Sequence, residues 1–100
     1  MTFDSLWQQL IGETAQPKEI KTWSAKKGYL DSTFLIQFRN GKIWCNSPGA
    51  QNIQVIPKKD FQKLFEVWDD YKKGYVQRQQ VRDLTRFSTY IIGILHHYIR

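Results

Sequence analysis

The chain is poor in the residues that define several common classes of small protein. Its 100 residues include one cysteine, Cys45, which cannot form an internal disulfide, so the cysteine-bridged scaffolds of small secreted proteins are excluded. No apolar run reaches the roughly 18 residues that a membrane-spanning helix requires. An acid, Asp4, stands where a secretory signal would carry positive charge. We therefore expect a protein of the reducing cytoplasm that has no membrane partner.

Motifs of enzymes and of metal sites are also lacking. HExxH, CxxC and the glycine-rich phosphate loop do not occur. His96 and His97 are adjacent, so their side chains diverge by about 100° on a helix and cannot readily share a metal. Glu19 and Lys21 have the acid-x-lysine spacing of some metal-dependent nucleases, but so short a match cannot be separated from chance. We expect no enzymatic activity, no cofactor and no metal site.

Repeats, low-complexity tracts and Pro/Gly/Ser-rich linkers are absent too, so nothing in the sequence indicates a second domain. Hydrophobic residues make up 41% of the chain and aromatic residues 15%. A chain of this length removes roughly two thirds of its unfolded surface from water when it folds. We expect residues 1–100 to form a single globular domain.

Alternation and turn residues predict a small antiparallel sheet. The strongest signal is TFLIQFRNGKIWCNS, in which Asn40 and Gly41, residues that tolerate positive φ, separate two alternating runs. The two-residue turn sets Ile36 opposite Cys45, and the free cysteine then lies on the core face as a small hydrophobic residue. We expect EIKTWS before this hairpin and NIQVI after it to add strands, and KKGYLDS to form a turn or loop. The predicted apolar face of the hairpin consists of Phe34, Ile36, Phe38, Ile43 and Cys45.

Helical periodicity marks the two flanks of this sheet. Asp4 is a good N-cap for a first helix that Gly12 ends. After Pro57, large apolar residues recur at steps of three and four until Gly74, a pattern typical of a helix that faces the core. The members of this second stripe are Phe61, Leu64, Phe65, Trp68 and Tyr71.

The end of the chain has the coarse plan of a helix-turn-helix unit. A helix from about residue 77 to 85, with Val81 and Leu84 turned inward, is joined by RFS to a helix over about 89–99 that Ser88 can cap. The second helix is apolar around more than half of its circumference, so we expect it to be largely buried. The predicted fold is α+β: an N-terminal helix, an antiparallel sheet of three or four strands around the Asn-Gly hairpin, and about three C-terminal helices on one sheet face.

Positive charge is concentrated in the C-terminal segment. The formal net charge is +6, and residues 71–100 contain six Lys and Arg residues against the single acid Asp83. Arg78, Arg82 and Arg86 recur at every fourth position and predict a basic ladder along one helix flank. Such a segment attracts phosphate polymers, so the leading hypothesis is a nucleic-acid-binding module with duplex DNA as its candidate partner. The residues expected at this interface are Lys72, Lys73, Arg78, Arg82 and Arg86 on the phosphates, and Ser88, Thr89 and Tyr90 nearest the bases.

Two other hypotheses come from the apolar residues. Leu35, Trp44 and Trp23 can lie exposed on the outer sheet face, as in a protein-interaction or homo-oligomerising module without enzymatic activity. Gly93, inside the last helix, costs about 1 kcal/mol relative to alanine and therefore indicates a close approach. Either the same helix of a second subunit, in a homodimer, or the protein's own sheet could make that approach. A third hypothesis is an aromatic-lined pocket for a small ligand.

Overall fold

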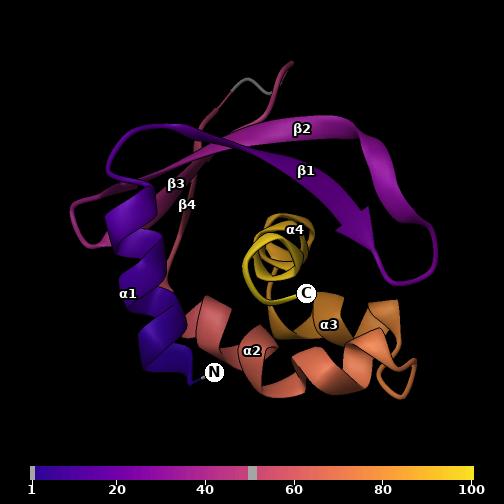
Figure 1. The fold of residues 1–100 in the computed structure, drawn as a ribbon. Helices are drawn as coiled ribbons and strands as arrows, with labels where there is room; N and C mark the ends of the chain where they lie inside the picture. Colours follow the sequence, from indigo (N-terminus) through magenta and orange to yellow (C-terminus); the bar gives the residue numbers. More distant parts are fainter. Residues whose placement is uncertain (1, 50–51) are drawn as a thin grey trace.

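The computed structural model describes residues 2–49 and 52–100 and has an α+β architecture. Within these residues, an N-terminal helix precedes a four-stranded antiparallel sheet and three helices follow it, as the sequence predicts (Figure 1). None of the described helices is long and apolar enough to cross a membrane. In chain order the elements are α1 (Phe3–Glu13), β1 (Lys18–Ser24), β2 (Gly28–Arg39), β3 (Lys42–Asn46), β4 (Gln54–Ile56), α2 (Lys58–Lys72), α3 (Arg78–Leu84) and α4 (Ser88–Ile99).

The strands lie side by side in chain order, and each pairs antiparallel with the next. The β2–β3 turn has the predicted backbone, with φ angles of 52° at Asn40 and 78° at Gly41. Ile36 lies opposite Cys45, which is the predicted register. Because register decides which side chains share a face, alternate residues of β2 and β3 are buried against the helices.

The β1–β2 hairpin is longer than the sequence suggests. The prediction of a turn or loop over KKGYLDS is right for Lys26 and Lys27 but wrong from Gly28 on, where β2 already begins. Between Lys21 and Trp23, one residue of β1 faces three residues of β2. A bulge of this kind re-aims the side chains around it, and Trp23 stacks on His96 of α4 with ring centroids 4.0 Å apart. The expectation that Trp23 lies on the outer sheet face is therefore wrong.

The last helix, α4, lies at the centre of the molecule. Figure 1 views it almost end-on beneath the curved sheet, with α2 and α3 on its other side. It packs on β1 and also contacts α2 and α3, and every residue from 91 to 95 is buried. Gly93 permits this packing, because a Cβ at that position would lie 3.3 Å from the Lys21 carbonyl oxygen and from the Phe34 ring. Gly93 is buried, so of the two predicted sources of the close approach it is the protein's own sheet that makes it.

The first helix begins earlier and ends later than predicted. Thr2 is its N-cap, and the Thr2 Oγ1 accepts a hydrogen bond of 3.1 Å from the Ser5 amide. Asp4 is therefore not the cap. It lies in the first turn, where its negative charge interacts favourably with the positive end of the helix dipole. The helix also continues through Gly12, because a single glycine near a helix end costs little enough for packing to override it.

The two C-terminal helices differ in smaller ways from their predicted forms. Val81 of α3 is buried, but Leu84, expected to turn inward beside it, is 36% exposed. The α4 helix starts at Ser88 itself, and Phe87 occupies the cap position. The connection between α3 and α4 has the predicted length of three residues, but it comprises residues 85–87 and not the predicted RFS, residues 86–88.

The core contains the stripe that the sequence predicts on α2. Phe61, Leu64, Trp68 and Tyr71 are buried, and Phe65 is partly buried against them, which confirms that this stripe faces the core. Cys45 is also fully buried, and desolvation raises the pKa of its thiol to about 12. It therefore remains a neutral, small hydrophobic residue at ordinary pH.

Candidate functional site

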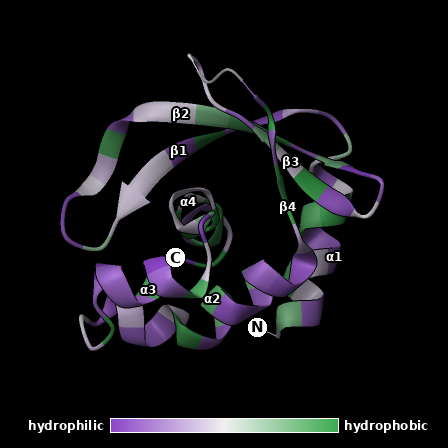
Figure 2. Cartoon of the chain, turned by 180° about the vertical axis from the view of Figure 1, so that it is seen from behind, coloured by the Kyte–Doolittle hydropathy of each residue, from purple (hydrophilic) through white to green (hydrophobic). Residues whose placement is uncertain are grey.

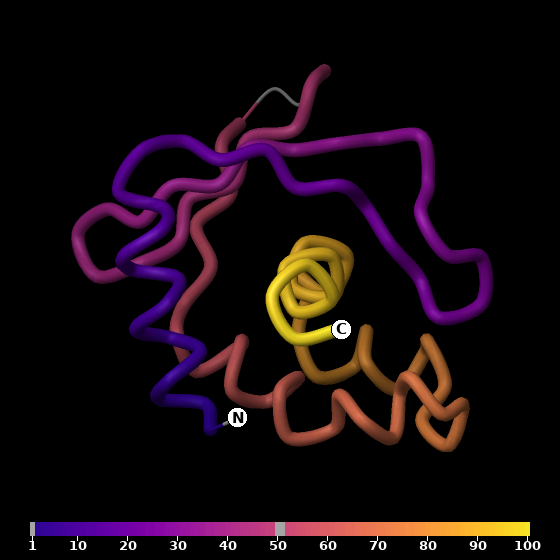
Figure 3. Tube along the Cα trace, in the orientation of Figure 1, coloured from indigo at the N-terminus to yellow at the C-terminus, as the bar shows by residue number. Residues whose placement is uncertain are grey.

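A groove runs between the tip of the β1–β2 hairpin and the helices α3 and α4. Figures 1 and 3 show the hairpin tip on the side of the molecule where α3 lies. The groove consists of three hollows: at the α2–α3 connection, along α3, and at the start of α4. Lys26 and Arg78 line both the first and the second hollow, and Thr22 and Thr89 line both the second and the third. Because neighbouring hollows share lining residues, the three adjoin one another, and together they form the groove.

Positive charge dominates the lining of this groove. One acid, Asp31, lines it, in the hollow at the start of α4. In Figure 2 the hairpin tip and much of α3 carry hydrophilic colours. A concave surface of one charge sign concentrates its field and attracts ions of the opposite sign. We call it the basic groove; seven basic residues line it: Lys26, Lys27, Lys72, Lys73, Arg78, Arg82 and Arg86.

Few of these cations are neutralised by the protein's own carboxylates. Within residues 2–49 and 52–100 the ion pairs are Lys18–Glu13 and Lys72–Asp69. The latter has a nitrogen–oxygen distance of 3.4 Å, and the Lys72 Nζ also donates to the carbonyl oxygen of Arg100 at 2.8 Å. Lys72 is therefore partly neutralised by Asp69. The other six groove cations form no ion pair with a carboxylate in the described structure.

Arg78 lies where the first two hollows meet and is the most constrained of these cations. It is half-buried, and its Nη2 donates a hydrogen bond of 2.9 Å to the Thr89 Oγ1. Its Nη1 is buried without a hydrogen-bond partner in the described residues. Burial lowers the pKa of this guanidinium, and nearby Arg82 lowers it further, while Tyr71 acts in the opposite direction. A guanidinium still remains charged at neutral pH, so Arg78 is a partly desolvated cation.

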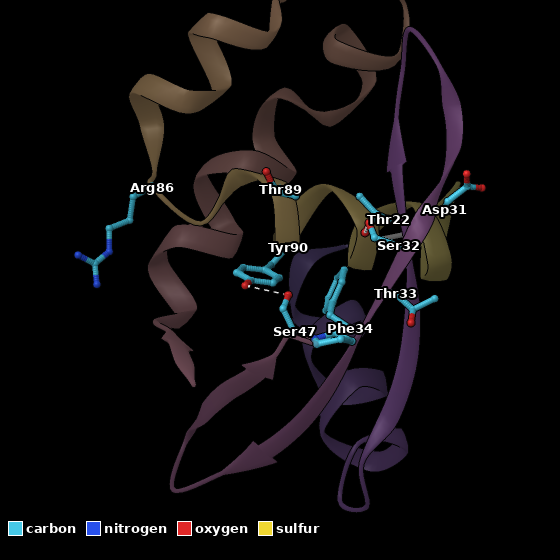
Figure 4. A pocket seen from close by; sticks show the side chains of 10 residues that line it. Thr22, Asp31, Ser32, Thr33, Phe34, Ser47, Arg86, Thr89 and Tyr90 are labelled. Atoms are coloured by element: carbon cyan, nitrogen blue, oxygen red, sulfur yellow. Dashed lines mark hydrogen bonds between the residues drawn. The ribbon is translucent and has the colours of Figure 1, made fainter. Parts of the chain in front are cut away.

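The predicted arginine ladder is only partly present. Arg82 is exposed on α3 and lines the same hollow as Arg78. Arg86, however, lies beyond Leu84, the last residue of α3, and its side chain extends outward from the edge of the third hollow (Figure 4). Its Cζ lies 4.8 Å from the centroid of the Phe87 ring. The prediction of one row along a single helix flank is therefore wrong, because the helix ends before the third arginine.

The start of α4 offers fewer contacts than predicted. Ser88 is only 4% exposed, so the prediction that it lies nearest the bases is wrong. Thr89 is exposed and lines the groove. Tyr90 is half-buried, with its hydroxyl 3.1 Å from the Ser47 hydroxyl and its ring edge-on to Phe34 (Figure 4). Because α4 is enclosed by the sheet and the other helices, it cannot enter a DNA major groove as the second helix of a helix-turn-helix does.

Lys26 and Lys27 are groove residues that the sequence interpretation missed. They occupy the turn between β1 and β2, and the hairpin places them opposite Arg78 and Arg82. The one available signal was the AKKG run between two candidate strands. A lysine-rich hairpin turn ordinarily faces solvent without a partner. Here the two lysines belong to a site only because the fold places them near arginines about 50 positions later in the chain.

The other predicted interface, on the outer sheet face, is partly apolar. Leu35 is 42% exposed and Ile53 is 47% exposed, and both line a small hollow with Trp44. The indole of Trp44 is half-buried, donates to the Arg39 carbonyl oxygen at 3.1 Å and carries the Arg39 guanidinium over its ring. Gly93, the predicted partner contact on the last helix, lies in the core on the opposite side of the sheet.

Neither a metal centre nor a relative explains the groove. In the part of the chain that the structure describes, no group of three or more His, Cys, Asp or Glu side chains could hold a metal ion. Comparisons with protein-family models, with curated proteins and with solved structures find no match. The chemistry of the groove residues themselves is therefore the basis for its function.

Proposed function

We propose that this chain is a nucleic-acid-binding module that holds the phosphate backbone in the basic groove. The observation that carries the proposal is the state of Arg78, which is half-buried beside other groove cations and has no carboxylate partner in the described structure. A partly desolvated charge without a counter-ion costs free energy. A bound phosphate would supply the negative charge that no carboxylate of the described structure provides, and guanidinium–phosphate hydrogen bonds are among the stronger ones in proteins.

The walls of the groove suit a polymer better than a single small anion. Its cations are spread over the hairpin turn, the end of α2, α3 and the α3–α4 connection. One phosphate can contact only the few that surround it, whereas successive phosphates of a chain can contact all of them in turn. Contacts of this kind position a nucleic acid without reading its sequence, so we expect weak base preference.

The salt dependence of binding tests the proposal. If about five phosphates are neutralised, the logarithm of the affinity should fall with the logarithm of salt concentration with a slope of about −4.5 for duplex or about −3.5 for single strands. Fluorescence anisotropy of labelled oligonucleotides at several salt concentrations measures this slope. An absence of binding at low salt would refute the proposal.

Charge-matched variants locate the interaction. Lys27→Gln with Arg82→Gln removes two exposed groove charges, and we expect weaker binding of every sequence and a salt slope smaller in magnitude by about 2. Lys59→Gln with Lys63→Gln removes two exposed charges from α2, at positions that do not line the groove. Equal losses in the two double variants would show that net charge alone, and not the groove, attracts the nucleic acid.

A second candidate function is protein interaction through the outer sheet face. The exposed side chains of Leu35 and Ile53, next to Trp44, form a small apolar surface there. A second copy or another protein could cover it. Light scattering together with Leu35→Lys separates the cases: a concentration-independent monomer with no copurifying protein would count against this function.

A further inference from the structure

The shape of the basic groove restricts the form of nucleic acid that it can hold. The groove is bounded by the β1–β2 hairpin on one side and by α3 and the start of α4 on the other. A duplex is a stiff rod with a persistence length of about 150 base pairs, and proteins read it by inserting an element into one of its grooves. Neither helix of the predicted helix-turn-helix plan is free to do so, because α4 is buried and Arg78 of α3 is turned inward to Thr89.

One aromatic side chain near the groove is not used by the fold. Tyr75 is 76% exposed, more than any other large hydrophobic residue in the described structure. It lies in the turn between α2 and α3, and its chain neighbours Gly74 and Val76 both line the first hollow of the groove. Tyr75 itself does not line that hollow, but it stands in the chain between two residues that do. Among the described residues its ring has no aromatic partner.

The turn that carries Tyr75 is well defined. The amides of Tyr75 and Val76 both donate to the Asp70 carbonyl oxygen, at 2.9 and 3.2 Å. Gly74 has a φ of 85°, which a glycine adopts without strain. The Gln77 side chain donates to the Gly74 carbonyl oxygen at 3.0 Å. The backbone that carries the Tyr75 ring is therefore already ordered, so stacking of a partner on the ring costs little backbone entropy.

We propose that the ligand of the basic groove is single-stranded nucleic acid, with a base stacked on Tyr75 and the adjoining phosphates along Lys26, Arg78 and Arg82. The assignment rests on the proposed function and specifies its substrate. A positively charged groove that follows the backbone, with an exposed aromatic side chain on which bases stack, is the combination that binds single strands without strong sequence preference. The aromatic residues that line the groove are already used by the fold. Phe34 and Tyr71 are buried, and Trp23 and Tyr90 are packed on His96 and Phe34.

Anisotropy titrations of strands and of the corresponding duplex test this assignment. Labelled single-stranded DNA, single-stranded RNA and duplex DNA are compared at the same salt concentration, since neither stacking nor phosphate contact distinguishes the two sugars. We expect at least one kind of single strand to bind about tenfold more tightly than duplex. Equal or tighter binding of duplex overturns the assignment and leaves the proposed function standing. Binding of none of the three overturns both.

Substitutions at Tyr75 separate stacking from charge. Stacking on one aromatic side chain contributes about 1–3 kcal/mol per base, so Tyr75→Ala should weaken single-strand binding about 5-fold or more, while Tyr75→Phe should retain it. Heparin, a polyanion without bases, should bind wild type and Tyr75→Ala equally, but should bind Arg82→Gln less well. An unchanged single-strand affinity in Tyr75→Ala overturns the stacking role. Because Tyr75 is exposed, neither substitution should disturb the fold.

Discussion

Gly93→Ala is expected to destabilise the protein, although alanine is the better helix former. In an exposed helix this exchange stabilises by about 1 kcal/mol. At position 93 the new Cβ would lie 3.3 Å from the Lys21 carbonyl oxygen and 3.3 Å from two atoms of the Phe34 ring. Neither neighbour can move freely, because Lys21 is held in β1 and Phe34 is buried between the sheet and α4. Overpacking of a core typically costs about 1–3 kcal/mol, which exceeds or cancels the helix gain.

Gly12 provides the matched control for this prediction. It also lies within a helix, α1, but a Cβ there would meet nothing within 4 Å. Gly12→Ala should therefore stabilise by up to about 1 kcal/mol, which for a domain of this size raises Tm by about 4–8 °C. Urea denaturation of both variants gives the two free energies of unfolding. If Gly93→Ala stabilises as much as Gly12→Ala, the close packing of α4 on the sheet is refuted.

Two further perturbations probe buried polar groups. Thr85→Val should cost about 1–3 kcal/mol in urea denaturation, because the buried Thr85 hydroxyl donates to Asp60 at 2.8 Å and accepts from the Phe87 amide at 3.1 Å; an unchanged midpoint would show that these bonds do not hold the α3–α4 connection. Cys45 has a folded pKa near 12 against 9.0 for the free thiol, so its contribution to stability is complete below pH 9 and is lost as pH rises from 9 toward 12. Stability measured across that range should fall less steeply in Cys45→Ala than in wild type, and equal slopes would contradict the raised pKa.

The parts of the fold that the sequence predicts are those set by local rules. The Asn40-Gly41 turn needs positive φ at both positions, and that requirement fixes the register of β2 and β3 without knowledge of the rest of the chain. The aromatic stripe of α2 likewise depends only on helical spacing. Both predictions are confirmed. Each depends on residues that are close together in the chain, so distant contacts could not change the result.

The incorrect predictions have a common physical origin. Trp23 faces α4 because a bulge between Lys21 and Trp23 shifts the alternation, and no local signal in EIKTWS marks that bulge. The positions of Leu84 and Arg86 differ from the predicted ones because α3 ends at Leu84. At that end the Thr85 hydroxyl donates a hydrogen bond to Asp60 of α2. Helix ends and strand irregularities are set by tertiary contacts, so periodicity alone could not place them.

The candidate site illustrates how much a charge pattern depends on the fold that displays it. The C-terminal arginines were evident in the sequence, yet by themselves they predict a convex basic helix suited to duplex DNA. The β1–β2 hairpin changes that conclusion, because it places Lys26 and Lys27 across from Arg78 and Arg82 and so converts a basic flank into a groove. The stacking of Trp23 on His96 holds the base of this hairpin against α4. The bulge in β1 and the groove therefore have one origin. The bulge turns Trp23 toward α4, and the resulting contact holds the hairpin that carries Lys26 and Lys27 along one side of the groove.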